Sequence, residues 1–166
     1  AHSLTASTPL PPFDASAMDG WAVSGPGPWE IIGEILAGQT GPRLGDGTAV
    51  RVGTGAALPA GTDAVLRRER GVVVEGPGRS RLYVGDSDSG RTDAHPGHID
   101  PGTDIRSRGV EAAAGDLLLA SGAVVTPAVI GMAAAAGYDS LGVVRPPDAA
   151  VLILGDELLE RGQARD

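Results

Sequence analysis

The sequence contains no cysteine, which excludes a disulfide framework or a thiolate zinc site and fits a reducing compartment. No apolar run approaches the roughly 18 residues needed to cross a bilayer, and the first residues lack the basic-then-apolar plan of a signal peptide. Basic residues are few, 13 against 21 acidic ones, and the formal net charge of −8 repels phosphate backbones. We therefore expect a cytoplasmic protein with no nucleic-acid or membrane partner.

Aromatic residues are also scarce, with two Trp, two Tyr and one Phe among 166 residues. Burial must therefore depend mainly on Val, Leu, Ile and Ala, and the 42% of hydrophobic residues is enough for a folded core. Glycine (26) and proline (13) are abundant, which indicates many turns and short strands rather than long helices. The composition predicts a loop-rich, mostly β architecture.

The middle of the chain carries short β-type runs separated by glycine-containing turns. This spacing is typical of a small β sandwich or barrel. The runs predict strands at 29–36, 48–52, 63–68, 71–75 and 81–84. The segment 85–104 that follows is almost without apolar side chains and predicts a long surface loop.

The last third of the chain has a different periodicity. Thr126 can cap a helix and Pro127 fits its first position, so we predict a helix at about 127–136. A strand is expected at 138–144. The unbroken apolar run 149–154, followed by a polar turn and a helix start, predicts the opening of a parallel α/β sheet.

Two glycine-flanked segments in the first half carry candidate functional residues. Asp14 and Asp19 lie five positions apart and on a loop could converge on one cation or one polar substrate. The alternative is that both carboxylates accept backbone N–H bonds in consecutive Asx turns. In the turn 53–55, backbone N–H groups and the Thr54 hydroxyl can point at an oxyanion, although Gly-Thr-Gly is also a common turn.

Two further segments lie in the second half. Arg106 and Arg108 are two positions apart, so on a strand they would share one face and could clamp an anion. Asp156 and Glu157 follow the apolar run, at the place where open α/β sheets bind ligands, or form a helix N-cap with an acidic first turn.

A loop also offers potential metal ligands, but a glycine- and proline-rich loop orients ligands poorly, so we expect adventitious or absent metal binding there. The residues concerned are Asp93, His95, His98 and Asp100.

Taken in order, four segments resemble the signatures of the molybdopterin molybdenumtransferase (MoeA/gephyrin) family, in its N-terminal portion. Residues 11–23, PPFDASAMDGWAV, are similar to the family's Pro-Phe-Asp, spacer, Ala-Met-Asp-Gly-Tyr-Ala. Residues 52–69 resemble its Thr-Gly-Ala-x-Leu-Pro-x-Gly-x-Asp-Ala-Val run. Residues 102–122 resemble its Asn-Ile-Arg-x-x-Gly-Glu-Asp-Ile segment, and 152–162 its Ser-Thr-Gly-Asp-Glu-Leu turn.

The resemblance implies an α+β, mostly β fold with three parts. A discontinuous, elongated domain I would comprise residues 1–25 and 101–146. A β-rich domain II would be inserted at 26–100. Residues 147–166 would begin a truncated α/β molybdopterin-binding domain III.

The resemblance also implies a function, namely molybdenum cofactor biosynthesis by insertion of molybdate into adenylylated molybdopterin with release of AMP, assisted by Mg²⁺ in a homodimer. Tungstate remains an alternative oxyanion, and the fragment alone is expected to be inactive. The implied catalytic residues are Asp19, Thr54, Glu111 and Glu157, with Asp19 and Glu157 as metal ligands and Asp156, Arg106 and Arg108 as cofactor-binding residues.

The chain departs from the family pattern at several of these positions. Glu111 stands where the family has Asp and reaches about one methylene further, and a displacement near 1 Å can cost a hundredfold in rate. Other departures are charged or apolar replacements at Arg67, Arg68, Asp104, Val110, Ile153 and Leu154. The departures at Glu111, Ile153 and Leu154 slightly favour the alternative function, a non-catalytic scaffold or partner-binding paralogue built on the same domains.

Overall fold

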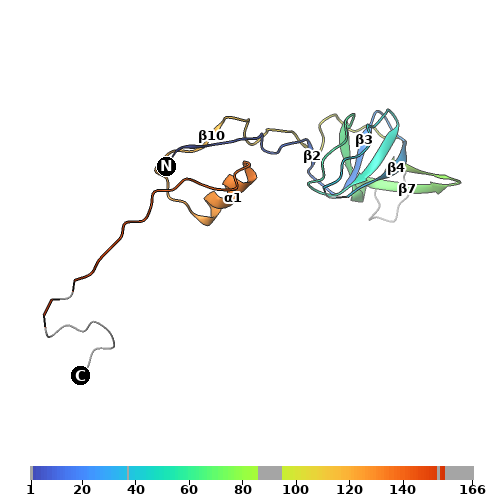
Figure 1. Cartoon of the computed structure of the whole chain (residues 1–166). Helices are drawn as coiled ribbons and strands as arrows, with labels where there is room; N and C mark the ends of the chain where they lie inside the picture. Colours follow the sequence, from blue (N-terminus) through green and yellow to red (C-terminus); the bar gives the residue numbers. More distant parts are fainter. Residues whose placement is uncertain (1, 37, 86–94, 153, 156–166) are drawn as a thin grey trace, which may run out of the picture.

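The computed structural model describes residues 2–36, 38–85, 95–152 and 154–155. Figure 1 shows a curled sheet at one end, a narrow two-stranded arm leading away from it, and a helix beside the arm. The predicted α+β, mostly β fold class is confirmed. In the described part of the chain, no helix is long and apolar enough to cross a membrane.

The main sheet has six strands in the order β6-β3-β5-β4-β8-β7. Its members are β3 (Gly20–Ser24), β4 (Trp29–Ile35), β5 (Thr48–Val52), β6 (Ala64–Arg67), β7 (Gly71–Gly76) and β8 (Arg79–Val84), with a short 3-10 turn at Arg68–Arg70. Neighbours are antiparallel except β4 and β5, which run parallel. All five strands predicted between residues 29 and 84 are confirmed, with ends shifted by two residues at most.

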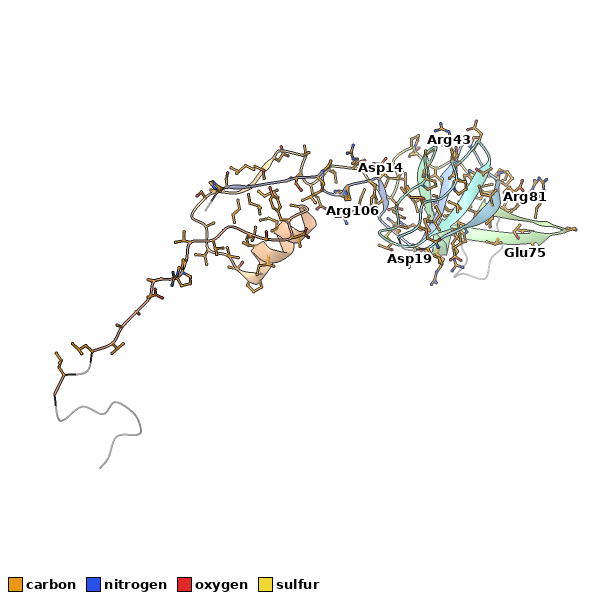
Figure 2. The ribbon with its side chains drawn as sticks, in the orientation of Figure 1. Asp14, Asp19, Arg43, Glu75, Arg81 and Arg106 are labelled. Carbon is orange, nitrogen blue, oxygen red and sulfur yellow. The ribbon has the colours of Figure 1, made fainter. Side chains whose placement is uncertain are left out.

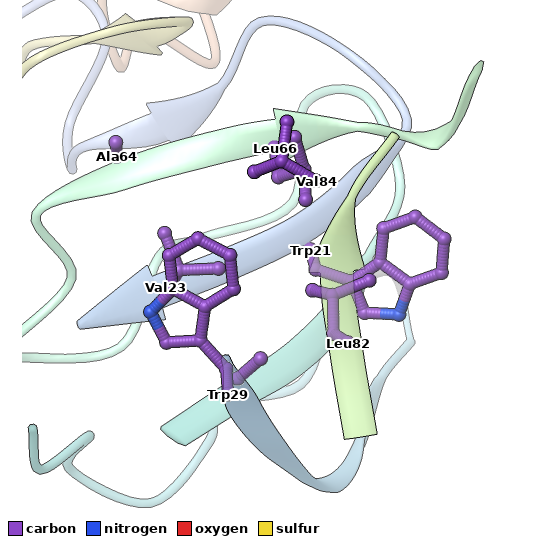
Figure 3. Packing of buried hydrophobic residues seen from close by; sticks show 8 residues of the cluster. Trp21, Val23, Trp29, Ala64, Leu66, Leu82 and Val84 are labelled. Carbon is purple, nitrogen blue, oxygen red and sulfur yellow. The ribbon is translucent and has the colours of Figure 1, made fainter. Parts of the chain in front are cut away.

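Each face of this sheet carries a cluster of buried hydrophobic side chains. One face packs around the two tryptophans, and Trp29 is completely buried with its indole N–H donated to the Gly25 carbonyl at 2.9 Å. Figure 3 shows this cluster, whose buried members are Trp21, Val23, Trp29, Ala49, Ala64, Leu66, Leu82 and Val84. The opposite face buries smaller side chains, namely Ala22, Ile35, Leu44, Val50, Val52, Ala56 and Val65. Both tryptophans lie in this core, so a chain with few aromatic residues still places its two largest side chains where they bury the most area.

Strand β3 was not predicted, and it lies inside the range 1–25 assigned to domain I. It is hydrogen-bonded between β5 and β6, so the six-stranded sheet already begins at Gly20. A Cβ at Gly20 would lie 2.0 Å from the backbone oxygen of Leu66 on β6. Glycine is therefore required here because the two backbones approach closely.

The arm is built from segments far apart in the sequence. Strand β1 (Leu4–Thr5) pairs with β10 (Leu117–Leu119), and β2 (Ala15–Ser16) pairs with β9 (Ile105–Arg106), both antiparallel. An isolated bridge joins Leu10 to Ala112 between them. The chain thus runs along the arm into the sheet and returns beside its own outward path (Figure 1).

Helix α1 (Pro127–Ala135) confirms the helix predicted at 127–136. The Thr126 side chain accepts a bond from the Val129 N–H at 3.3 Å, and Pro127 occupies the first turn. Gly137 follows with φ +90, the left-handed conformation common just beyond a helix end. The helix has no polar side chain, yet Ala133 is its only buried residue.

Two predicted strands are wrong. Residues 138–144 form no ladder, and Val144 is 75% exposed. In the apolar run 149–154, the described residues also form no strand, and Val151 is 87% exposed. Apolar content alone predicted these strands, but a strand also needs hydrogen-bonding neighbours, and no described segment pairs with either run. The predicted helix start at 156–166 lies outside the described residues.

Candidate functional site

Asp19 lies in the turn between β2 and β3, at the point where the arm meets the sheet. Its Oδ1 accepts two hydrogen bonds from Thr54, one from the backbone N–H and one from the side-chain hydroxyl, each 2.7 Å long. Thr54 itself follows β5, the neighbour of β3, so adjacent strands bring the two residues together. The other carboxylate oxygen, Oδ2, has no described hydrogen bond.

These contacts favour the ionised form of Asp19. The Thr54 hydroxyl bond lowers the pKa of the Asp19 carboxyl most, followed by the Thr54 backbone bond. Partial desolvation opposes this, while the positive charges of Arg68 and Arg51 lower the pKa further. Asp19 is therefore an exposed, pre-oriented carboxylate at neutral pH.

Asp19 borders an open cleft of about 180 Å³. The cleft is lined by Asp19, Gly20, Trp21, Glu34, Arg51, Val52, Gly53 and Arg68. Arg51 forms a long ion pair with Glu34, with 3.8 Å between Nε and Oε1. Charges of both signs therefore face the same small space, which suits a polar ligand carrying anionic and hydrogen-bonding groups.

A second cleft of about 380 Å³ continues from the first, because both are lined by Glu34 and Gly53. Its walls are more apolar and include Phe13 and Leu36, which are 44% and 56% exposed. Together the two clefts place a charged region beside an apolar one, with Gly53 lining both and Thr54 and Gly55 lining the apolar one.

Three donors of the predicted oxyanion nest at Gly53-Thr54-Gly55 are already bonded to groups of the protein. Both Thr54 donors point to Asp19, and the Gly55 N–H is donated to the Ser16 carbonyl at 2.8 Å. The sequence pattern identified real donors at this turn, but their acceptors are groups of the protein. The turn holds a carboxylate of the chain instead of a free anion.

The Asx-turn alternative for Asp14 and Asp19 is correct in that both carboxylates accept backbone N–H groups, but it is wrong about the donors, which do not belong to local turns. Asp14 Oδ1 accepts the backbone N–H of Arg108 at 2.7 Å, and Asp19 accepts that of Thr54. Both carboxylates therefore accept backbone N–H groups, from residues 94 and 35 positions away. Local turns cannot account for such partners, which only the tertiary fold brings close.

Arg106 and Arg108 do not form the predicted shared clamp. Arg106 lies on β9 and pairs with Glu111, whereas the Arg108 side chain donates to the Pro12 carbonyl at 3.0 Å, beyond the end of the strand. Both therefore bind groups of the arm. Figure 2 shows Arg106 on the arm side of the junction and Asp19 at the edge of the sheet.

The other predicted site residues are not brought to Asp19 by a described contact. Glu111 has Arg106 as its partner, and both Asp156 and Glu157 lie outside the described residues. Across the described ranges, no group of three or more His, Asp or Glu side chains is placed to hold a metal ion. Asp93 of the predicted loop cluster also lies outside the described residues. In the same cluster, His98 Nε2 and Asp100 Oδ1 are 3.9 Å apart.

Two features of this region were not predicted: the cleft residues Glu34 and Arg51, and an ion pair between Arg67 and Asp104. Alternation along β5 marks Arg51 as pointing away from the core, but only strand order puts it beside Asp19. Arg67 and Asp104 were each noted as departures from a pattern, and the structure shows that they contact one another.

The amino-acid sequence of the chain is similar to that of known proteins. A family model described as the MoeA N-terminal region (domain I and II) matches residues 1–137. The molybdopterin molybdenumtransferase of Bacillus subtilis (strain 168) is 34% identical over 170 residues, covering 96% of the chain and 37% of that protein. Molybdopterin molybdenumtransferase 2 of Mycobacterium tuberculosis (strain ATCC 25618 / H37Rv) is 44% identical over 62 residues, covering 37% of the chain and 15% of that protein.

Solved structures agree with these sequence matches. A crystal structure of the molybdopterin biosynthesis MoeA protein from Pyrococcus horikoshii OT3 matches with a TM-score of 0.64 and 25% identity, covering 82% of the chain and 35% of that protein. Another Pyrococcus MoeA structure matches with a TM-score of 0.63 and 26% identity, covering 82% and 34%. The chain thus spans little more than a third of the length of the Bacillus protein and of these structures.

Proposed function

Because the chain belongs to the MoeA family, whose N-terminal region it contains, we propose that it is the front part of a molybdopterin molybdenumtransferase. The enzyme would act in molybdenum cofactor biosynthesis, inserting molybdate into adenylylated molybdopterin with release of AMP. Support comes from the relatives named molybdopterin molybdenumtransferase and from the MoeA structures. We further propose a cytoplasmic homodimer, as the resemblance implies.

The observation that carries this proposal is the Asp19 carboxylate held by both donors of Thr54 at the rim of a charged cleft. One oxygen is fixed by two 2.7 Å bonds. We propose that the other, Oδ2, contacts the ligand. Such pre-orientation is how an active site avoids reorganisation during reaction.

The residues of this cleft fit a magnesium ion that is shared with a substrate. Mg²⁺ is usually bound through one or two carboxylates together with substrate phosphates and water, rather than by a complete protein cage. Asp19 supplies one such carboxylate, and its lowered pKa keeps it ionised. Glu157 is the second ligand that we propose. When bound, the ion would neutralise phosphate charge and polarise the phosphoanhydride that is cleaved.

The chain's own residues would then bind and orient the substrate. Arg51 and Arg68 line the cleft, and we propose that their positive charges attract a phosphate or an oxyanion of the substrate there. Thr54 fixes the direction of the Asp19 carboxylate. The more apolar cleft beside Phe13 suits a ring of the substrate.

The proposal is tested by Asp19→Asn in the complete protein, with AMP release from adenylylated molybdopterin in the presence of molybdate as the readout. We expect a loss of about a hundredfold or more, because an ionised group that orients a metal or charge is removed. Glu75→Gln is the matched control: Glu75 lies on β7, does not line the cleft and bonds Ser80. Figure 2 shows it away from Asp19.

Full activity of Asp19→Asn would remove Asp19 from the mechanism. A folded wild-type protein that neither binds adenylylated molybdopterin nor releases AMP would instead favour the scaffold alternative. Replacing molybdate by tungstate in the same assay identifies the oxyanion that is used.

A further inference from the structure

Arg67 and Asp104 form a two-point ion pair close to the Asp19 turn. Arg67 Nε donates to Asp104 Oδ2 at 2.7 Å, and Nη2 donates to Oδ1 at 2.9 Å. The Asp104 side chain is only 13% exposed, whereas that of Arg67 is 45% exposed. Two parallel bonds of this kind fix the orientation as well as the distance of the partners.

The backbone of each partner adjoins the segment that carries Asp19. The Asp104 carbonyl accepts the Ala17 N–H at 2.8 Å. On the other side, Arg67 is paired with Gly20 across β3 and β6, and the N–H of the following residue, Arg68, is donated to the Asp19 carbonyl at 2.9 Å. The ion pair therefore joins the two backbone segments that hold the turn 17–20.

Asp104 is placed for this contact by an unusual backbone conformation. Its φ of +55 is left-handed, which Asp and Asn tolerate better than most residues. The preceding residue, Thr103, accepts the Val65 N–H of β6 through its carbonyl at 3.0 Å. The turn that carries Asp104 is thus attached to β6 by a backbone bond at Val65 and by the ion pair at Arg67.

We propose that Arg67 and Asp104 are positioning residues for the Asp19 carboxylate, holding the turn 17–20 so that Asp19 meets both donors of Thr54. The effect of this positioning on enzyme activity rests on the proposed role of Asp19. The geometry itself can be measured without substrate or turnover.

The test is an NMR titration of the Asp19 carboxyl in the chain, combined with hydrogen exchange of the Thr54 N–H. The variants are Arg67→Met and Asp104→Asn, which leave Asp19, Thr54 and the charged groups that face the carboxylate, Arg51, Arg68 and Glu34, in place. In both variants we expect the pKa of Asp19 to rise and the Thr54 N–H to exchange about tenfold faster, as its bond to Asp19 loosens.

The two variants separate positioning from simple charge effects. Removing the Arg67 charge raises the pKa of a nearby carboxyl, whereas removing the Asp104 charge lowers it. A rise in both variants therefore has to come from a displaced Asp19. The double variant should shift the pKa of Asp19 by an amount between the shifts of the two single variants, because the two charge effects cancel while the two-point contact is lost in all three.

Arg79→Met is the control, since it breaks the ion pair of Arg79 with Glu30 elsewhere on the sheet and should leave Asp19 unchanged. Arg67→Lys keeps the charge without the two-point contact and should give an intermediate exchange rate, in a variant that preserves the local charge balance. An Asp104→Asn chain with native Trp fluorescence, an Asp19 pKa that stays or falls, and native Thr54 exchange would overturn the proposal.

Discussion

Replacing Gly20 by Ala tests whether the close approach of β3 and β6 is as tight as the structure shows. The added Cβ would lie 2.0 Å from the Leu66 carbonyl oxygen and 2.9 Å from its carbon. Relief requires the two strands to separate by about 1 Å, a distortion of the overpacking kind that costs about 1–3 kcal/mol. Loosening the adjacent hydrogen bond from Arg68 N–H to the Asp19 carbonyl adds about 1 kcal/mol.

We therefore expect Gly20→Ala to lower the free energy of unfolding by about 2–4 kcal/mol. With a urea m-value of about 2 kcal/mol/M, the midpoint falls by about 1–2 M. The assay is urea unfolding followed by tryptophan fluorescence, since Trp21 and Trp29 are 8% and 0% exposed in the sheet core.

Gly45→Ala is the matched control, because a Cβ at Gly45 meets nothing within 4 Å and its φ is not in the left-handed region. Its midpoint should stay near that of the unchanged chain. A Gly20→Ala midpoint and m-value equal to those of Gly45→Ala would refute the reasoning, since β3 and β6 would then tolerate a side chain between them.

Two further predictions concern single hydrogen bonds. Thr54→Val removes the hydroxyl donor that lowers the pKa of Asp19 most. Because the pKa of Asp19 in the folded chain lies below the ordinary value of 3.8, Asp19 stabilises the fold above that pH, and this contribution is lost as the pH falls through the lowered pKa. The variant should therefore lose less stability on acidification, measured by urea unfolding at successive pH values. Thr126→Ala removes the N-cap of α1 and should cost the helix about 1 kcal/mol, seen as faster hydrogen exchange of the Val129 N–H; equal exchange in both chains would show that the cap contributes nothing.

Local patterns predicted the elements whose stability is decided locally. The helix 127–136 has its cap, its N-terminal proline and its terminal glycine within a few positions. The β runs between 29 and 84 were visible from β-branched residues and glycine turns. By contrast, β3 carries Gly20, Ala22 and Ser24 and is buried throughout, so it showed no alternation of apolar and polar residues.

The candidate site was harder to predict because its contacts join distant segments. Sequence identified Asp19 and Thr54 separately, but their bond spans 35 positions and depends on the order β6-β3-β5. It also left open whether the donors at Thr54 bind a free oxyanion or belong to a common turn, whereas in the structure a carboxylate of the chain accepts both. The same limit explains Arg106, whose partner Glu111 was predicted to act apart from it.

The pairing of β2 with β9 has a consequence for how the chain can be divided. Ala15 lies opposite Arg106, so the backbone leaves for the sheet and comes back at adjacent points. A short designed linker could therefore replace residues 16–105 and leave β1 paired with β10. The sheet that is removed could be produced separately as a module of its own. A change in the size of the sheet at this junction would likewise leave the pairing of β1 with β10 in place.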